Sequence, residues 1–98
     1  MVSSQVKTVK FAEGCLSYHQ AVSLEEQLCR QDGQARIVLD LQDTPEATTA
    51  ALAKLVVLRR RLRMSGGDLC LAHICGRTRD LYEINRMSGL LPCQLPAD

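Results

Sequence analysis

One stretch decides the fold class of this 98-residue chain: ARIVLDL, residues 35–41. It is short and nearly continuously apolar, and it lies between Gly33 and Pro45, two residues that favour turns. Stretches of this length and composition are typical of strands that are buried on both faces of a parallel sheet. We therefore predict a central parallel strand over residues 35–41.

The residues before this strand predict two short strands and a helix. Residues 5–11 alternate polar and apolar side chains and favour an edge strand, and residues 14–16 follow a turn as a second short strand. A helical period begins at Ser17, which has the spacing of a capping box with Gln20, and Gly33 suits the left-handed cap at the helix end. The inner face of this helix holds Ala21, Leu24 and Leu28, and the outer face holds Gln20, Glu25, Glu26 and Arg30.

The residues after the strand alternate between helices and strands. Residues 43–46 form a loop, in which Pro45 disfavours helix at Thr44. A long helix over residues 48–64 is capped by Thr48 or Thr49 and ends at Gly66-Gly67. Its apolar stripe holds Leu52, Leu55, Val56, Leu58 and Leu62.

Two strands and one more helix complete the pattern. Residues 68–72 predict a further buried strand. Residues 77–88 predict a helix whose inward side chains are Leu81, Ile84 and Met87, with Gly89 as its cap. Residues 90–95 predict a last short strand that Pro92 restricts to a sheet edge.

This order of elements predicts an α/β fold. Strands that alternate with helices favour a mainly parallel central sheet of four to five strands, with about three helices packed on it. A chain of 98 residues suffices for one core, so we expect a single domain over residues 1–98.

Composition argues against several classes of function. The net charge of +1 provides no attraction to nucleic acid or to a membrane surface, and Phe11, Tyr18 and Tyr82 are too few aromatic residues for a base-stacking platform. The arginines of residues 59–63 are interpreted as a solvated helix end that complements the helix dipole. No segment has the length of a membrane span or the character of a signal peptide, so the expected location is the cytoplasm.

The cysteines and histidines predict neither a metal site nor a disulfide framework. The cysteine count is five, no pair has C-x-x-C spacing, and Cys70 is interpreted as a small core residue. The sequence contains no nucleotide-binding or hydrolase motif, so we expect no cofactor, no catalytic residue and no enzyme. A small cysteine-dependent enzyme using Cys75 or Cys15 remains the alternative from a different class, although His73 lies too close in sequence to Cys75 to activate it.

The loop between the central strand and the long helix is the candidate binding site. Ligands of open α/β sheets bind beyond the carboxyl ends of the strands, and a helix N-terminus suits a hydroxyl that receives phosphate. The expected partner-binding residues are Asp40, Asp43, Thr44, Glu46, Thr48, Thr49 and Leu52. The simpler interpretation is that the threonines are helix caps and that the acids favour the helix dipole.

Three segments together resemble a STAS domain, the domain of bacterial anti-sigma factor antagonists. They are residues 35–43, residues 66–72 and residues 81–90 (LYEINRMSGL). The resemblance extends over residues 14–91, and we expect a short version of the domain without the terminal helix that many members carry. It implies a STAS-like fold and a protein that acts by binding a partner.

The resemblance also implies a partner and a switch. Such antagonists bind an anti-sigma factor, commonly a serine/threonine kinase of the histidine-kinase ATPase fold, which phosphorylates a hydroxyl at the start of the long helix, and a phosphatase reverses the modification. The usual pattern there is Asp-Ser-Ser-Gly-Leu, and this chain has Thr48-Thr49-Ala50-Ala51-Leu52. The resemblance therefore makes Thr49 the first phosphorylation candidate and Thr48 the second. A STAS-like subunit of a stressosome or of a lipid-transport complex is the alternative.

Overall fold

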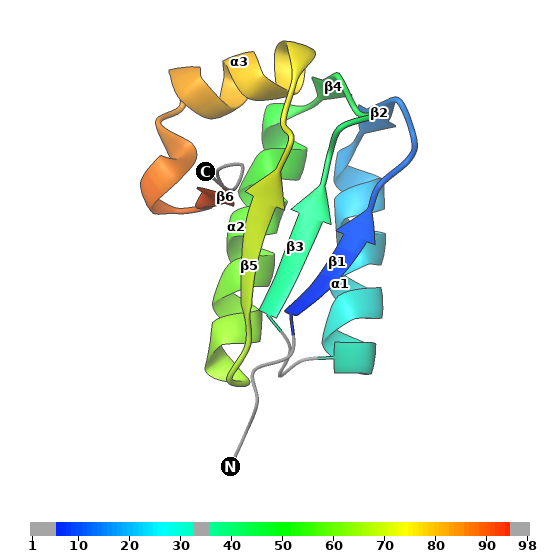
Figure 1. The fold of residues 1–98 in the computed structure, drawn as a ribbon, viewed down its shortest axis with the longest axis vertical. Coiled ribbons are helices and arrows are strands. Elements are labelled where there is room, and N and C mark those ends of the chain that lie inside the picture. Colours follow the sequence, from blue (N-terminus) through cyan, green and yellow to red (C-terminus); the bar gives the residue numbers. More distant parts are fainter. Residues whose placement is uncertain (1–5, 33–35, 95–98) are drawn as a thin grey trace.

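A computed structural model describes residues 6–32 and 36–94 of the chain, and Figure 1 shows its fold. The strands are β1 (Val6–Lys10), β2 (Cys15–Leu16), β3 (Arg36–Asp40), β4 (Glu46–Ala47), β5 (Asp68–Ala72) and β6 (Cys93–Gln94). The helices are α1 (Tyr18–Asp32), α2 (Thr49–Met64), α3 (Gly76–Ile84) and the short 3-10 helix η1 (Met87–Gly89). The predicted order of strands and helices is confirmed, and only β4 falls where the sequence predicted a loop.

The main sheet is parallel and four-stranded, in the order β1-β3-β5-β6. The central strand β3 lies between β1 and β5, with Leu39 in register with Val9 and Leu71. The strands β2 and β4 form a separate two-stranded parallel sheet, in which Cys15 pairs with Glu46. The fold class predicted from the sequence is therefore confirmed.

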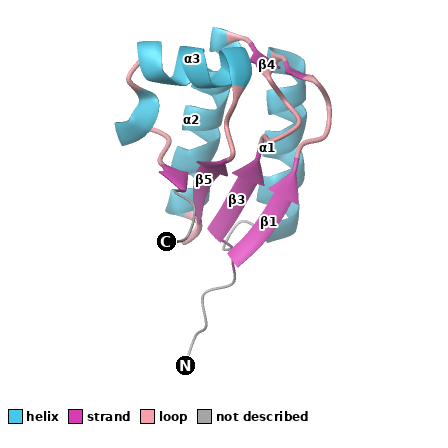
Figure 2. Cartoon of the chain, turned by 45° about the horizontal axis from the view of Figure 1, so that its top comes forward, coloured by secondary structure: helices cyan, strands magenta, loops and turns pink. Residues whose placement is uncertain are grey.

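The two long helices, α1 and α2, lie on the same face of the sheet (Figures 1 and 2) and pack against each other. The core between this face and the helices consists largely of leucine, because the chain contains so few aromatic residues. Its fully buried members include Leu16, Leu39, Leu41, Leu52, Leu55, Leu58, Leu62, Leu69, Leu71 and Leu91. Burial of this apolar surface is the main force that holds the helices on the sheet.

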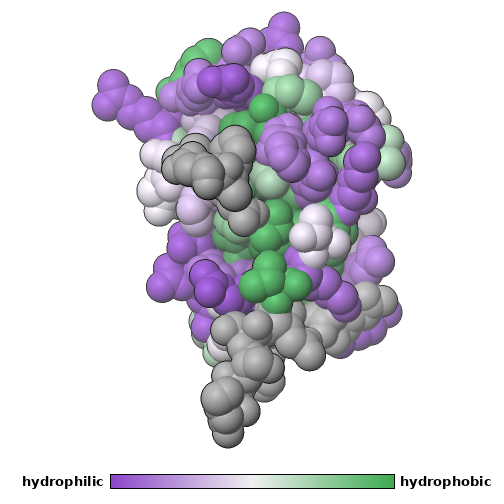
Figure 3. Space-filling model, in the orientation of Figure 1, coloured by the Kyte–Doolittle hydropathy of each residue, from purple (hydrophilic) through white to green (hydrophobic). Residues whose placement is uncertain are grey.

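The other face of the sheet carries a second apolar area. Figure 3 shows apolar side chains gathered over the strands on the side away from α1 and α2. A groove of about 400 Å³ on the sheet is lined in part by Val38, Cys70 and Pro92. Cys70 is only partly buried and lies outside the main core, so its interpretation as a core residue was wrong.

Side-chain caps define the starts of the two long helices as predicted. At α1, the Ser17 amide donates to Gln20 Oε1 at 2.9 Å and the Gln20 amide donates to Ser17 Oγ at 3.4 Å, which is the expected capping box. At α2, the cap is Thr48, whose hydroxyl oxygen accepts from the Ala51 amide at 3.1 Å. The expected role of Gly33 lies outside the described residues.

The third helix is shorter than the sequence predicted. It ends at Ile84, and Arg86 then adopts a left-handed backbone with φ 51° before η1 begins. Ile84 is 75% exposed, so its predicted inward position was wrong, and Gly89 lies inside η1 rather than at a helix cap. Tyr82 is the buried residue instead, and its hydroxyl donates to the Leu91 carbonyl at 2.5 Å.

Arg60, Arg61 and Arg63 at the end of α2 are exposed as predicted, whereas Arg59 is partly buried. The Arg59 Nε atom contacts Asp68 Oδ1 at 2.9 Å, and another guanidinium nitrogen donates to the Leu90 carbonyl at 3.2 Å. Arg59 therefore joins the end of α2 to β5 and to the segment after η1. None of the helices among the described residues is long and apolar enough to cross a membrane.

Glu25 lies between α1 and α2, not on the outer face where the helical period placed it. Only 5% of it is exposed, and its carboxylate contacts Lys54 Nζ at 2.9 Å and an Arg61 guanidinium nitrogen at 3.2 Å. Burial by itself would raise the pKa of this carboxyl, but the hydrogen bonds from Lys54 and Arg61 outweigh that effect and hold the pKa below its ordinary value of 4.5. A buried carboxylate of this kind is tolerated because it is paired.

The substitution Glu25→Gln is expected to lower the free energy of unfolding at pH 7 by roughly 1–3 kcal/mol, because it removes the charge that Lys54 and Arg61 contact. The lowered pKa means that this stabilisation is present above pH 4.5 and is lost as the pH falls through the folded-state pKa. Urea unfolding should therefore separate the two proteins at pH 7, and the difference should shrink progressively as the pH is lowered below 4.5. The control is Glu26→Gln on the exposed side of α1, and an equal effect of both substitutions would contradict the assignment.

Candidate functional site

The candidate site lies at the carboxyl edge, the end of the sheet where β1, β3 and β5 finish and where α2 begins. Thr44 connects the loops there. Its side chain is fully buried, and its hydroxyl lies 2.8 Å from the Glu13 carbonyl and 3.0 Å from the Phe11 carbonyl. Its own carbonyl accepts from the Thr78 hydroxyl at 2.8 Å, and its amide donates to the Leu41 carbonyl at 3.0 Å. The loops after β1 and β3 are thus joined to each other and to α3.

Close backbone packing joins the start of α3 to the same loop. The Thr78 amide donates to the Pro45 carbonyl at 3.1 Å. Gly76 has a left-handed backbone with φ 57°, and a Cβ atom there would lie 2.7 Å from the Pro45 carbonyl oxygen. Only glycine fits such a contact without a shift of the backbone, so this position fixes where α3 begins.

The small sheet of β2 and β4 sets the position at which α2 begins. The Glu46 amide donates to the Gly14 carbonyl at 3.2 Å, and the Thr48 amide donates to the Leu16 carbonyl at 3.1 Å. The hydroxyl of Thr48 faces back into the helix as its cap. The next residue, Thr49, is exposed at the first position of the helix.

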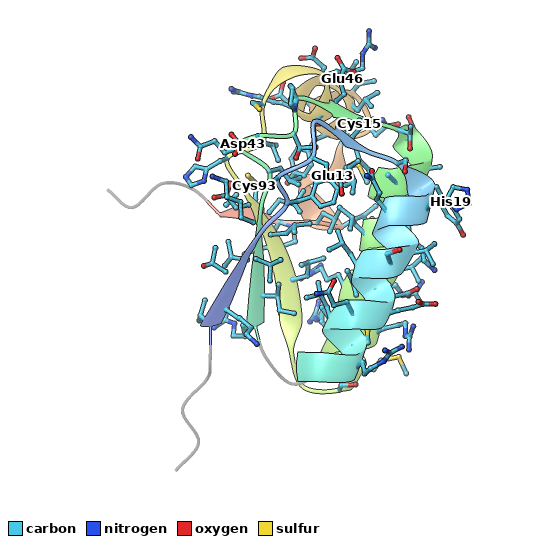
Figure 4. The ribbon with its side chains drawn as sticks, turned by 90° about the vertical axis from the view of Figure 1, so that its right-hand side faces the viewer. Glu13, Cys15, His19, Asp43, Glu46 and Cys93 are labelled. Carbon is cyan, nitrogen blue, oxygen red and sulfur yellow. The ribbon has the colours of Figure 1, made fainter. Side chains whose placement is uncertain are left out.

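The edge is rimmed by charges of both signs. Lys10 Nζ contacts Asp43 Oδ2 at 3.1 Å, and Arg77 Nε contacts Glu46 Oε1 at 3.4 Å, all with side chains at least half exposed. Exposed pairs of this kind add little to stability, and their side chains are accessible at the surface. Figure 4 shows Glu13, Cys15, Asp43 and Glu46 at this end of the molecule, whereas His19 lies on the outer side of α1.

Asp40 serves a local structural role at the end of β3. Its Oδ1 atom accepts from the Gln42 amide at 2.9 Å and contacts His73 Nδ1 at 3.3 Å. The hydrogen bond from the Gln42 amide, aided by His73 and Lys10, holds the pKa of this carboxyl below its ordinary value despite partial burial. His73 itself has a left-handed backbone with φ 56°, and the Asp40 contact holds the turn that leads to α3.

The predicted site residues divide into two groups. Asp43, Glu46, Thr48 and Thr49 are exposed, and Asp40 lies beside them with a side chain that is 15% exposed. Thr44 and Leu52 have no exposed surface, so the expectation that their side chains contact a partner needs correction. The Thr44 hydroxyl instead hydrogen-bonds within the loop region, and the Leu52 side chain packs α2 into the core.

Sequence reasoning missed Lys10, Glu13, Cys15 and Arg77 as members of this edge. They come from segments far from residues 40–52 in sequence, and only the pairing of β1 with β3, of β2 with β4 and of α3 with β4 brings them together. The carboxyl ends of parallel strands meet at one edge of the sheet, so residues after β1 belong there as much as residues after β3. This rule could have identified Lys10 and Glu13 from the sequence.

The structure does not pair Cys75, one of the two cysteines of the alternative enzyme, with His73. The Cys75 thiol donates to the Gln42 carbonyl at 3.3 Å, and the imidazole Nδ1 of His73 contacts Asp40. The Cys75 thiol thus faces backbone carbonyl oxygens while His73 contacts Asp40, so these two side chains do not form a nucleophile–base pair. Within the described ranges, 6–32 and 36–94, no three acidic, histidine or cysteine side chains are grouped closely enough to hold a metal ion.

Comparison with known proteins identifies the fold and a relative. No family model matches the chain. Over 82 residues, covering 82% of this chain and 71% of the relative, it is 28% identical to BtrV of Bordetella bronchiseptica, which carries the name of an anti-sigma factor antagonist. This chain has a STAS-like fold and resembles anti-sigma factor antagonists. The resemblance to this family that the sequence indicated is thereby confirmed.

A solved structure agrees on the fold. The murine Solute Carrier 26 family member A9 anion transporter, in its inward-facing state, superposes with a TM-score of 0.65 at 15% identity. The superposition covers 88% of the STAS-like chain but only 14% of the transporter chain. At this identity the likeness concerns the fold alone.

Gly76→Ala is expected to lower the free energy of unfolding by about 1–3 kcal/mol, because it adds a Cβ against the Pro45 backbone at a left-handed position. The matched control is Gly14→Ala, whose Cβ would meet no atom within 4 Å. Urea unfolding of the two variants beside the wild type checks the prediction. Equal stability of both variants would show that the Gly76 contact does not fix the start of α3.

Proposed function

We propose that this STAS-like chain, as one domain over residues 1–98, is a regulatory module that binds an anti-sigma factor through the carboxyl edge. The partner is a serine/threonine kinase of the histidine-kinase ATPase fold. Phosphorylation of Thr49 ends the interaction, and a phosphatase restores it. The relationship to an anti-sigma factor antagonist supports the regulatory role. The exposed hydroxyl of Thr49 at the head of α2 is the observation that carries the proposal.

Thr49 is a better phosphate acceptor than Thr48 on geometric grounds. The Thr48 hydroxyl oxygen accepts from the Ala51 amide, so modification there would disturb the cap of α2. The Thr49 side chain is exposed one residue later, within the first turn of the helix. The positive end of the helix dipole favours an added phosphate at this position.

The proposed switch acts on the surface rather than on the fold. A phosphate adds about 1.5 to 2 negative charges, and the rim that already holds Asp43 and Glu46 becomes more acidic. A partner surface that fits a neutral threonine would then meet like-charge repulsion and a costly desolvation. Because the phosphate lies at a helix N-terminus, α2 itself stays folded.

The chain differs from the usual Asp-Ser-Ser-Gly-Leu motif at four positions, residues 48–51, and the changes at Thr48 and Ala51 are compatible with this role. Thr48 stands where the family has an acid, and threonine and aspartate both cap helices through a side-chain oxygen. Ala51 stands where the family has glycine, and it is a fully buried helical residue for which alanine is the better helix former. The start of α2 is therefore preserved, while the charge next to Thr49 is lost.

The remaining parts of the proposal follow from the partner. An anti-sigma kinase and its opposing phosphatase act in the cytoplasm of a bacterium, so we place this chain there. The role needs neither a cofactor nor a direct contact with nucleic acid or membrane. The chain regulates transcription through the sigma factor that its partner releases.

Thr49→Glu is expected to weaken binding to the anti-sigma kinase by on the order of tenfold or more, because it places a permanent negative charge at the rim. Thr49→Ala is expected to bind as the wild type does and to accept no phosphate. Isothermal titration with the purified kinase, with mass spectrometry after incubation with ATP, measures both effects.

The control for helix stability is Thr48→Ala, which should cost about 1 kcal/mol of unfolding free energy through the lost cap but should leave Thr49 phosphorylated. Equal binding of Thr49→Glu and wild type would contradict the switch at this residue. A wild-type chain that fails to bind any such kinase would contradict the proposed partner and favour the scaffold role.

A further inference from the structure

The helix α2 has a second, outward row of side chains that the core does not use. Its buried stripe holds Ala51, Leu55, Leu58 and Leu62, with Leu52 beside them. The outward row, called the α2 seam, consists of Ala50, Ala53, Val57, Arg60 and Met64. All five of these residues are exposed, with Val57 at 43% and Met64 at 87%.

The spacing of the α2 seam is that of a helix-docking surface. Its members follow one another at intervals of three and four residues, which keeps them on one face over the whole helix. Alanines lie near Thr49, where a partner can approach the backbone closely, and the larger side chains lie toward the other end. Apolar residues at this spacing on an exposed face are typical of a groove or seam that receives another helix.

The charges on α2 define what such a partner must carry. The helix contains no acidic residue, and its five cations are Lys54, Arg59, Arg60, Arg61 and Arg63. Glu25 pairs with Lys54 and Arg61, and Asp68 pairs with Arg59. Among the described residues, neither Arg60 nor Arg63 has a carboxylate in salt-bridge contact, although the charge of Arg63 helps to lower the pKa of Asp68. Both arginines are exposed beside the far end of the α2 seam.

We propose that the α2 seam receives an amphipathic helix of the partner protein, with acidic side chains that meet Arg60 and Arg63. This inference rests on the proposed function and extends the docking surface from Thr49 along the length of α2. A second copy of the chain does not fit the α2 seam. Two copies of α2 would bring arginines together, and neither helix has a carboxylate to offset their repulsion. Acidic residues on the partner complement the arginines instead.

The position of the α2 seam would allow a single phosphate at Thr49 to weaken binding along the whole partner helix. Thr49 lies one residue before Ala50, the first member of the seam. A helix seated on the seam therefore ends close to the Thr49 hydroxyl. The same acidic character that suits Arg60 and Arg63 would make that helix sensitive to a phosphate at the other end.

The test measures binding of the purified anti-sigma kinase to single variants at two salt concentrations. Arg60→Glu is expected to slow association by on the order of tenfold at low salt, and the difference should shrink at about 0.5 M salt. The matched control is Arg36→Glu, which makes the same change of charge at an exposed residue of β3, outside α2. Val57→Gln, which keeps the helix but removes the apolar side chain, is expected to speed dissociation several-fold.

The outcomes separate the inference from the function on which it rests. If Arg60→Glu and Val57→Gln bind as Arg36→Glu does while Thr49→Glu still weakens binding, the proposed function stands and the seam is wrong. If the wild type does not bind the kinase, both fail. Arg60-dependent binding of the wild type to phosphatidylserine vesicles would also overturn the inference, because the arginines would then serve a membrane. Circular dichroism and urea unfolding confirm that each variant is folded.

Discussion

The buried hydroxyl of Thr44 donates toward the carbonyls of Phe11 and Glu13, and the carbonyl of the same residue accepts from Thr78. These contacts join the loops after β1 and β3 to α3. The same loops lead into β2 and β4, which pair to form the small sheet. A buried carbonyl that loses its donor costs about 1–3 kcal/mol, so the network strongly favours one arrangement of the edge. The exposed threonine at the head of α2 therefore lies on a rigid base, which suits a surface that a partner must recognise.

The two faces of α2 differ in their contacts, and in the proposed function only one of them takes part in recognition. One face supplies leucines to the core, and Glu25 and Asp68 neutralise the cations nearest to the rest of the fold. The opposite face retains apolar side chains and two arginines that the described residues do not pair. In the proposed switch, a change of charge at Thr49 would therefore alter what the helix binds without altering how it packs.

The sequence predicted the elements well where one physical rule dominated. The apolar stretch around Leu39, the capping residues Ser17 and Thr48 and the pair Gly66-Gly67 each follow from local rules, and all appear in the structure. The predictions failed where long-range contacts decided. Glu25 is buried because Lys54 and Arg61 lie opposite it. In α3, Tyr82 rather than Ile84 is the buried residue, and its hydroxyl donates to the Leu91 carbonyl nine residues later in the chain. The buried role of Thr44 could not be predicted either, since its acceptors lie about thirty residues earlier in the chain.

In the proposed complex, the carboxyl edge and the outer face of α2 form one docking surface, which backbone amide NMR of the labelled chain can map. On titration with the anti-sigma kinase, the signals of Glu46, Thr49, Ala53 and Arg60 are expected to shift or broaden. Signals of Arg36 and Cys70, on the strands, should stay unchanged. Changes concentrated at Arg36 and Cys70, with residues 46–60 unaffected, would show that the partner docks elsewhere.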